Sequence, residues 1–311
     1  MLVNHNGAAC LGRTLEALAR NTTTQQVEGI VVDSGSVDDS WEGVERAWPQ
    51  ARALRFEENI GFCAGCNRGA EAATGRLLAF VNFDGEVEPG WDEPLLTLLD
   101  NRSISISTGL LLSSDGEVIQ AAGLAIAPNT AVVGRLDMLP RAAAPSQPID
   151  VPAATGALMM VRRQEFLELG GFYEPFFMYG EEADYCLRVP GRIVLHPGSA
   201  MRHEYGHASG PQRSGTRLYW GSRNRLINAA RHLPPVSLAK SVVSSFGFDL
   251  LTLAQLRSRS AAGAVARGWL DGVRHMRRER AARSADERRR ATGRLMSLRE
   301  AIAEQRRLGR L

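Results

Sequence analysis

A short apolar run that stops at polar residues is the feature that most limits the fold of this chain. Residues Leu77–Val81 are all apolar, and Asn82-Phe83-Asp84 follows directly. Five apolar residues that end at turn-forming residues predict a buried β-strand. Ligands of open α/β sheets bind outside the carboxyl ends of the strands, where Asp84 is expected. Asp84 is therefore either a cation ligand at this edge or a turn residue, because Asp is also common in turns.

The residues before this run repeat a pattern of strand followed by helix. Strands are expected at 1–3, 29–32 and 53–56, and helices at 10–20, 40–48 and 64–73. Strands that alternate with helices at this spacing favour βαβ units and a parallel sheet. Asp33 ends the second strand just as Asp84 follows the fourth. Both carboxylates are therefore expected at one edge of the sheet, where they would share a nucleotide site.

The pattern is weaker after residue 110. A hairpin-like turn is expected at 113–116, a loop at 141–152, strands at 157–162 and 193–195, and helices at 164–169, 218–233 and 236–256. An arginine-rich helical tail is expected at 267–311. These patterns predict an α/β domain over residues 1–233 and a helical, arginine-rich extension over residues 234–311.

Three carboxylates open a predicted helix directly after an aromatic stretch, at Glu181, Glu182 and Asp184. Acidic residues in a first helical turn stabilise the helix through its macrodipole, and this accounts for all three in structural terms. Alternatively, one carboxylate is shielded by Phe176, Phe177 and Tyr179, and it acts as a general base because burial raises its pKa.

A histidine and a cysteine pair are further candidates for binding chemistry. His203 is either a structural residue or, together with Asp84 and diphosphate oxygens, a ligand of a divalent cation such as Mn²⁺. His196 and His207 lie nearby and are alternatives. Cys63-Ala64-Gly65-Cys66 has the CxxC spacing, but the chain has no second CxxC pair. A packing role is therefore favoured over zinc or redox chemistry.

The charge of the chain is unevenly distributed. Residues 267–311 contain 14 Arg and 6 acidic residues, a net charge of +8, which leaves −5 for the remainder because the total is +3. The apolar segment 236–256 contains Gly247 and Asp249, so we expect a poor membrane span and no transmembrane helix. This segment and the basic tail suit peripheral contact with an anionic membrane. A solvated helix or an oligomer contact is the alternative.

The first residues show no basic region followed by an apolar one, as a signal peptide would. A cytoplasmic location is therefore expected, with the peripheral contact at the inner face of the cell membrane.

Five ordered motifs over about residues 2–231 resemble the inverting family 2 glycosyltransferases of GT-A fold, especially the rhamnosyltransferase-like branch. The motifs are Val3-Asn4-His5-Asn6-Gly7, residues 31–38, Asn59-Ile60-Gly61-Phe62 with Asn67-Arg68-Gly69, Val81-Asn82-Phe83-Asp84, and residues 171–188. The resemblance implies a Rossmann-like central mixed, mostly parallel sheet flanked by helices.

The resemblance also implies a role for each matched residue. The residues implied along the donor pocket are Asn4, Asp33, Asp38, Asn59, Gly61, Asn67 and Asn82. Asp84 and His203 would bind a divalent metal, Mn or Mg. Glu182 would be the catalytic base, at a position where the family usually has Asp. The extra methylene of Glu would move the carboxylate by about 1 Å, a shift that can lower the rate.

The implied reaction moves a sugar from a nucleotide-diphosphate sugar to a glycan or lipid-linked acceptor with inversion, in surface polysaccharide or cell-wall biosynthesis. By branch resemblance the donor would be dTDP-rhamnose. A non-catalytic or degenerate nucleotide-sugar-binding scaffold is the alternative, and a nucleotidyltransferase is a third class. The third class is disfavoured because the chain shows no Gly-rich loop bearing Arg or Lys near residue 1. No nucleic-acid partner is expected.

Overall fold

The computed structural model describes residues 1–24, 26–204, 214–281, 293–297 and 299–300. The chain divides into two compact units, and each is considered by itself. The α/β unit comprises Met1–Leu124, Gly134–Phe177 and Val189–Ala208. The helical unit comprises Ala125–Val133, Met178–Arg188 and Ser209–Leu311. Residues 209–233, which we assigned to the α/β domain from the sequence, thus group with the helical unit.

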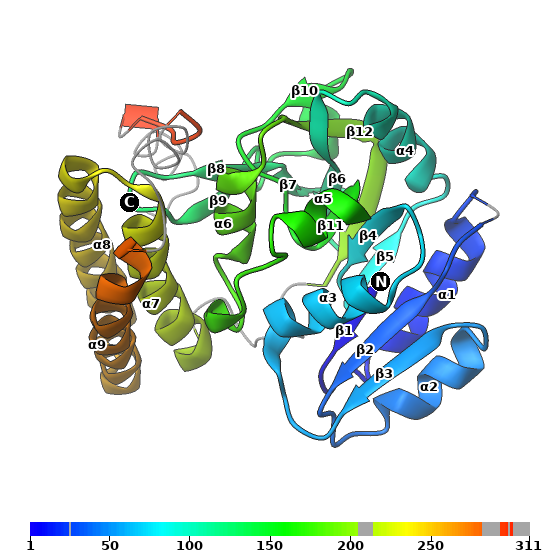
Figure 1. The fold of residues 1–311 in the computed structure, drawn as a ribbon, viewed down its shortest axis with the longest axis horizontal. Helices are drawn as coiled ribbons and strands as arrows, with labels where there is room; N and C mark the ends of the chain where they lie inside the picture. The colour runs from blue at the N-terminus through cyan, green and yellow to red at the C-terminus, as the bar shows by residue number, and fades with distance from the viewer. Residues whose placement is uncertain (25, 205–213, 282–292, 298, 301–311) are drawn as a thin grey trace. The chain divides into compact units, whose positions relative to one another are not determined.

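A sheet of three parallel strands begins the α/β unit (Figure 1). Its strands are β1 (Leu2–Asn4), β2 (Ile30–Ser34) and β3 (Arg52–Phe56), and the helices between and after them are α1 (Leu11–Asn21), α2 (Ser40–Ala47) and α3 (Gly61–Ala72). Asn4 of β1 lies opposite Asp33 of β2. α1 buries Leu11, Leu15 and Leu18 at helical spacing, which is the apolar pattern that predicted it.

The larger sheet of the α/β unit has the strand order β10-β12-β6-β11-β4. These strands span Ile149–Asp150, Arg192–His203, Ile104–Leu112, Leu158–Arg162 and Leu77–Val81. β5 (Gly85–Val87) pairs with β12, and β7 (Ile119–Ala122) pairs with β6. The expected mixed sheet is present, but among the pairs of this larger sheet only β6 and β12 run parallel. In this larger sheet most pairs are antiparallel, because β11 enters antiparallel between β4 and β6, whereas the three-stranded sheet is parallel.

The two sheets are joined at β1 and β4. The backbone N–H of Val81 donates to the carbonyl of Met1 (3.1 Å), and the Met1 nitrogen donates to the carbonyl of Ala79 (2.7 Å). One residue that bonds to both neighbours of the residue opposite it is the pattern of a parallel pair. The carboxyl ends of β1, β2 and β4 therefore lie at one edge, as the positions of Asp33 and Asp84 predicted.

Short helices and hairpin strands complete the description of both units. In the α/β unit, α4 (Asp92–Asp100) packs on β6, and α5 (Arg163–Glu168) follows β11. Two single-turn 3-10 helices span Arg141–Ala143 and Glu174–Phe176. The strands β8 (Leu124–Ile126) and β9 (Val132–Gly134) form a small hairpin. This hairpin spans Ala125–Val133, the first segment of the helical unit.

The helical unit is built on α6 (Glu181–Arg188), α7 (Gly215–His232), α8 (Pro235–Leu256) and α9 (Arg259–Ala281) (Figure 1). α7 and α9 cross closely where α9 has glycines. A Cβ atom on Gly268 would lie 2.2 Å from Ser222 Oγ, and one on Gly272 would lie 2.9 Å from Leu226 Cδ1. The helices expected at 218–233 and 236–256 are confirmed, whereas most of the expected helical tail after Ala281 lies outside the described residues.

α8 differs from the expectation in two respects. Gly247 lies inside one continuous helix of 22 residues and does not break it. This helix is also long and apolar enough to cross a membrane by length and composition. Only 17% of its apolar 18-residue stretch is buried within the protein. By length and composition the helix therefore meets the criteria of a membrane span that Gly247 and Asp249 were expected to prevent, because Asp249 is a single charge among apolar residues.

Candidate active site

Asp84 and His203 meet at the carboxyl end of β4. Asp84 follows β4 and β12 ends at His203, and the two side chains approach to 3.1 Å between Asp84 Oδ1 and His203 Nε2. β5 pairs with the end of β12, so that Gly85 lies opposite His203 and sets this approach. The two expected metal ligands are thus brought together by the topology of the sheet. Asn82 joins them, with its Nδ2 atom 3.4 Å from His203 Nε2.

Gln120, which sequence reasoning missed, orients the histidine ring. Its Nε2 donates to the carbonyl oxygen of His203 (2.9 Å), which directs its Oε1 to His203 Nδ1 at 3.2 Å. Nδ1 therefore carries a ring proton, and Nε2 is the ring nitrogen that faces Asp84. A ligating histidine is oriented in this way by a hydrogen bond at its other nitrogen.

The Asp84 carboxylate has a buried oxygen that faces the histidine ring. Asp84 Oδ1 makes no hydrogen bond among the described residues, and His203 Nε2 lies 3.1 Å from it. A buried carboxylate oxygen and an imidazole nitrogen that face one another can both ligate a cation, and this donor set suits Mn²⁺ or Mg²⁺. The described part of the chain has no group of three or more His, Cys, Asp or Glu side chains that could hold a metal. Two protein ligands would leave the other coordination positions to phosphate oxygens and water.

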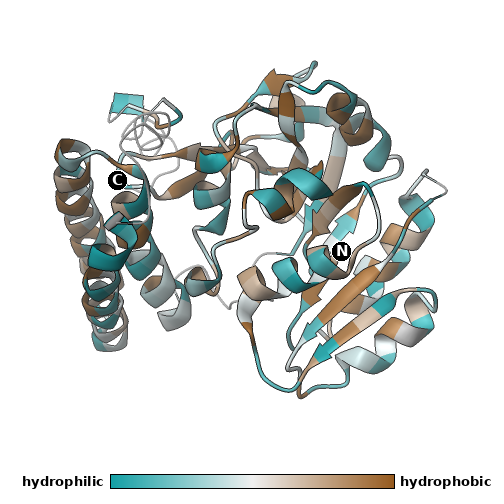
Figure 2. Cartoon of the chain, in the orientation of Figure 1, coloured by the Kyte–Doolittle hydropathy of each residue, from teal (hydrophilic) through white to brown (hydrophobic). Residues whose placement is uncertain are grey.

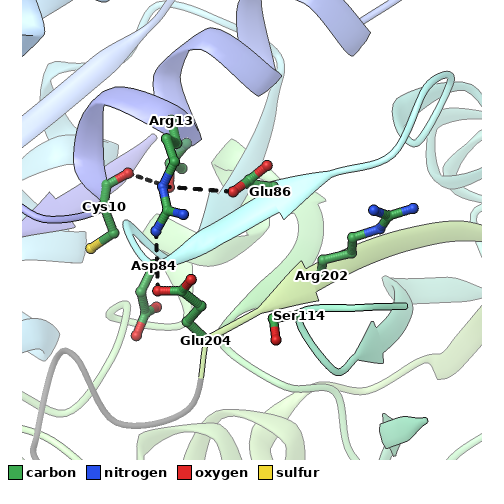
Figure 3. Close-up of a pocket in the computed structure, with 8 residues that line it drawn as sticks. Cys10, Arg13, Asp84, Glu86, Ser114, Arg202 and Glu204 are labelled. Atoms are coloured by element: carbon green, nitrogen blue, oxygen red, sulfur yellow. Dashed lines mark hydrogen bonds and ion pairs between the residues drawn. The ribbon is translucent and has the colours of Figure 1, made fainter. Parts of the chain in front are cut away.

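A pocket of about 100 Å³ opens beside Asp84 (Figure 3). Arg13 lies between two carboxylates on its wall, with Nη2 3.1 Å from Glu204 Oε2 and Nε 3.8 Å from Glu86 Oε1. Burial, followed by the charges of Asp84 and Glu204, raises the pKa of the Cys10 thiol to about 12. Cys10 is therefore a neutral wall residue, and the pocket has the mixed charge that a polar ligand requires.

The expected donor residues at β1 and β2 form a buried hydrogen-bonded cluster. Asn4 is fully buried, and its Nδ2 lies within 3.1 Å of Asp33 Oδ1, Ser36 Oγ and Ser40 Oγ. Asp33 is 1% exposed and also accepts from Ser36 Oγ (2.5 Å). Asn4 therefore holds Asp33 and the loop after β2 in place through hydrogen bonds.

Asp38 and Asn59 support the two loops at this edge. Asp38 accepts from the backbone N–H of Ala8 (2.9 Å) and from Ser40 Oγ (2.6 Å). Partial burial alone would raise the pKa of Asp38, but these hydrogen bonds hold it below its usual value. Asn59 Oδ1 accepts from Ser34 Oγ (3.0 Å) and from the N–H of Gly61 (2.9 Å). Both residues thus fix the two loops at this edge of the sheet.

Gly61 and Asn67 have roles in packing that the sequence pattern did not reveal. Gly61 has φ +81°, and a Cβ atom there would lie 2.5 Å from the Phe177 ring. Asn67 donates to the carbonyl of Phe172 (2.8 Å) and to Glu174 Oε1 (3.1 Å), and its own Oδ1 accepts from the Phe172 N–H (2.9 Å). Both polar groups of the Asn67 amide therefore bond within the protein. Cys63 and Cys66 are buried thiols on α3, in agreement with packing.

His196, one of the two alternative histidines, bonds within its own strand and not to Asp84. His196 Nδ1 accepts from the backbone N–H of Gly198 (3.0 Å), within the irregular part of β12. His207 lies outside the described residues.

The carboxylates of α6 belong to the helical unit and have different surroundings. Glu181 is 4% exposed, and burial, together with the neighbouring charge of Glu182, raises its pKa well above the usual value. Glu182 is half-buried. The pKa increase that we expected for a shielded carboxylate thus falls on Glu181, the neighbour of the proposed base.

Asp184 is the centre of a buried ionic cluster. It is fully buried, and it lies 2.8 Å from Arg188 Nε, 2.9 Å from Arg231 Nε and 2.8 Å from His232 Nε2. Burial alone would raise its pKa, but Arg188, His232 and Arg231 together hold it well below the usual range. Asp184 is therefore a structural anion, and it connects α6 to the end of α7.

Two asparagines on α7, also missed from the sequence, hold the loop that leads into α6. Asn224 Nδ2 donates to the carbonyls of Met178 (2.9 Å) and Tyr179 (2.7 Å), and Asn228 Nδ2 donates to that of Gly180 (2.9 Å). The two asparagines are buried and one turn apart. This spacing, unusual for buried amides, was the available signal in the sequence. They fix the loop from which Glu181 and Glu182 follow.

The sequence profile described as "Glycosyl transferase family 2" matches residues 1–170, which is more than half of the 311-residue chain. The chain belongs to glycosyl transferase family 2. The matched segment contains β1 to β4, Asp84 and the strand β11. The chain therefore belongs to a family of glycosyltransferases, as its motifs predicted.

Curated relatives of this family 2 glycosyltransferase agree. A putative polypeptide N-acetylgalactosaminyltransferase 13 of Drosophila melanogaster is 30% identical over 228 residues, 64% of this chain and 40% of that protein. The O-antigen biosynthesis protein RfbC of Myxococcus xanthus is 27% identical over 217 residues, 65% of this chain and 16% of that protein. The chain thus spans less than half the length of either relative.

Solved structures of other glycosyltransferases confirm the GT-A fold. GalNAc-T7, crystallised with UDP, GalNAc and Mn²⁺, aligns with a TM-score of 0.59 at 19% identity, over 75% of this chain and 47% of that chain. S. aureus TarS 1-349 aligns with a TM-score of 0.56 at 13% identity, over 99% and 90%. The mannosyltransferase PcManGT of Pyrobaculum calidifontis, in complex with GDP-Man and Mn²⁺, aligns with a TM-score of 0.53 at 15% identity, over 94% and 84%.

Proposed function

We propose that this family 2 glycosyltransferase is an inverting, metal-dependent enzyme that uses a nucleotide-diphosphate sugar. The observation that carries the proposal is the pair Asp84 and His203, held 3.1 Å apart at the end of β4 with a buried carboxylate oxygen that faces the ring. The Mn²⁺ in the GalNAc-T7 and PcManGT structures supports the same choice of cofactor. When bound, a divalent ion at this pair would neutralise charge on a diphosphate leaving group.

The residues around this pair have separate proposed tasks. Asp33 and the loops held by Asn4, Asp38 and Asn59 would bind the nucleoside end of the donor, and Asn82 would orient His203. Gly61 and Asn67 would support the donor pocket through packing. Gly61 lies close to the Phe177 ring, and Asn67 bonds to the backbone of Phe172.

Glu182 is the proposed general base, and it would take the proton from the acceptor hydroxyl as that oxygen attacks the sugar. Attack from the face opposite the leaving group inverts the anomeric carbon. The buried neighbour Glu181 has a raised pKa, because burial and the charge of Glu182 disfavour its ionisation, and this would limit a second charge beside the base.

The finer identity of the substrates is also a proposal. We propose dTDP-rhamnose as donor, on the resemblance of the motifs to the rhamnosyltransferase-like branch. A glycan or lipid-linked acceptor of surface polysaccharide or cell-wall synthesis is supported by the similarity to RfbC, an O-antigen biosynthesis protein. We propose the cytoplasm as the site of action, because all four cysteines are buried thiols rather than disulfides.

The test is release of nucleoside diphosphate from a panel of nucleotide sugars, with and without Mn²⁺. A thermal-shift screen of the same panel selects the donor first, because a ligand that binds the folded state raises its melting temperature. Glu182→Gln should abolish turnover and keep the donor-dependent shift, while Glu168→Gln, an exposed residue on α5, should change neither.

Donor binding with no turnover in the wild-type chain would instead support the non-catalytic scaffold. Equal activity of the Glu182→Gln variant and the wild type would remove Glu182 as the base. Turnover that is unaffected by Mn²⁺, Mg²⁺ or a chelator would contradict the metal dependence.

A further inference from the structure

α8 is polar on its buried side and apolar on its exposed side. Its buried residues are Ser241, Ser245 and Asp249, at intervals of four. Its exposed side carries Val236 (68% exposed), Val243 (73%), Phe246 (54%), Leu250 (52%) and Leu251 (52%). A surface helix of a protein in water has the opposite arrangement. Figure 2 shows the apolar residues distributed along the whole length of the helix.

The polar side of α8 is held by the rest of the helical unit. Asp249 accepts from Arg225 Nη2 of α7 (2.5 Å) and from Trp269 Nε1 of α9 (2.7 Å). The Trp269 ring also packs edge-on against Phe246 at 5.7 Å between centroids. This carboxylate faces the interior of the helix bundle with a cationic partner, as acidic residues do in helices that face lipid.

The charges of the segment favour an anionic surface. Residues 234–281 contain eight basic and three acidic residues. The three acids, Asp249, Asp271 and Glu279, are each paired with an arginine within the helical unit. Lys240 lies within the apolar side, and Arg257 and Arg259 follow the end of the helix, all three exposed. The exposed ionic groups of this segment are thus largely positive, and anionic lipid headgroups attract such groups.

The same charges distinguish between two occupants of the apolar side. A second copy of the chain would bring a second set of arginines and Lys240 against the first, whereas an anionic bilayer supplies the opposite charge. A lysine within an apolar stripe can extend its amine to the headgroups while its methylenes remain among the acyl chains. The 22-residue helix is about 33 Å long, enough to bury a continuous apolar stripe in one leaflet.

We propose that the exposed side of α8 binds the surface of an anionic lipid bilayer, with the helix lying in the plane of the membrane. The side chains of Val243, Phe246 and Leu250 enter the acyl region, and Lys240, Arg257 and Arg259 contact the headgroups. α8 remains packed on α7 and α9 through Ser241, Ser245 and Asp249, which explains why an apolar helix of spanning length lies on the membrane and does not cross it. This binding is independent of glycosyl transfer and does not require a sugar donor.

The test is flotation of the full chain with vesicles of phosphatidylcholine alone and with about one third phosphatidylglycerol. The double variant Phe246→Glu/Leu250→Glu should bind anionic vesicles at least about tenfold more weakly, because each change removes a large apolar side chain and adds a repelled charge. The matched control is Val37→Glu/Met138→Glu, which alters two apolar residues of the α/β unit that are 92% and 70% exposed. This control should bind like the wild type.

Circular dichroism and urea unfolding show that each variant is folded. The wild type should prefer anionic vesicles and be released from them by alkaline carbonate extraction, as an interfacial helix would be. Equal binding by the α8 variant and the wild type would assign membrane binding to another part of the chain and overturn the proposal. Absence of vesicle binding combined with a dimer that the α8 changes dissociate would also overturn it, in favour of a second copy. Resistance to carbonate would contradict the in-plane position.

Discussion

Removing the charge of Asp184 is expected to destabilise the helical unit strongly. Asp184→Asn keeps the size of the side chain but leaves Arg188, Arg231 and His232 facing a neutral amide in a fully buried site. Breaking a buried ion pair by removing one partner typically costs about 3–5 kcal/mol, because the remaining charge is left without compensation. We therefore expect a loss of about this size in the free energy of unfolding at pH 7.

The matched control lies in the same unit. Asp271 accepts hydrogen bonds from Tyr219 (2.9 Å) and Arg274 (3.1 Å), but its side chain is 33% exposed. Solvent screens such a pair, so Asp271→Asn should cost no more than about 1 kcal/mol. The contrast between the two variants compares a buried carboxylate that has three ionic partners with a partly exposed one that has a single arginine partner.

The pH dependence provides a second, independent check on Asp184. Its pKa in the folded protein is well below that of an unfolded Asp, which is about 3.9. A carboxylate whose folded pKa is depressed stabilises the protein above the unfolded pKa, and this stability is lost as the pH falls through the folded pKa. The gap between the wild type and Asp184→Asn should therefore be full above about pH 5 and shrink below about pH 4.

Urea unfolding measures the loss in unfolding free energy. Hydrogen exchange of peptides from α6 and α7 then shows whether that loss is localised around Asp184. Equal losses for Asp184→Asn and Asp271→Asn, or a gap that does not change between pH 7 and pH 3, would refute the reasoning.

Three further predictions follow from single contacts. Glu181→Gln should stabilise the chain relative to the wild type increasingly as the pH rises above about 4.3, the pKa of an unfolded Glu, in urea unfolding, because ionisation of a carboxyl whose folded pKa is raised costs stability. Gly61→Ala should lower the unfolding free energy by more than about 2 kcal/mol, because alanine disfavours φ +81° and its Cβ would clash with Phe177. Gly12→Ala is the control and should raise the unfolding free energy slightly, because Gly12 lies in α1 with open space around it. Gln120→Leu should weaken Mn²⁺ binding by about 10–100-fold in calorimetric titration, because His203 loses its orienting partner, with Gln164→Leu as the exposed control.

Local sequence patterns predicted those elements in which apolar residues are flanked directly by polar ones. The strand expected at Leu77–Val81 has those same bounds in the structure, because polar residues flank it on both sides. β12 shows the limit of such reasoning. Only 193–195 was expected, yet the strand spans Arg192–His203, with its register shifted between Leu195 and Ala200. Pro197 and Gly198 signal the end of a strand, but here they lie in a bulge that the neighbouring strands accommodate.

Site residues were predicted from the sequence where a motif lies at the expected edge of the sheet. Site residues were missed where their hydrogen-bond partner is distant in the sequence. The approach of His203 to Asp84 follows from the topology of β4, β5 and β12. Gln120 belongs to β7, and no local pattern around it indicates that its amide meets a histidine 83 residues later. The same holds for Asn67, whose amide meets the backbone of Phe172 over a separation of 105 residues.

The three carboxylates of α6 show how surroundings divide one sequence pattern into different roles. Asp184 is surrounded by two arginines and a histidine, so its charge is neutralised by cations. The causes that raise the pKa of Glu181 are burial and the charge of Glu182, so ionisation of Glu181 is disfavoured. The surroundings of both neighbours thus limit the negative charge beside Glu182, the half-buried member of the three. This division of roles supports our proposal that Glu182 is the general base.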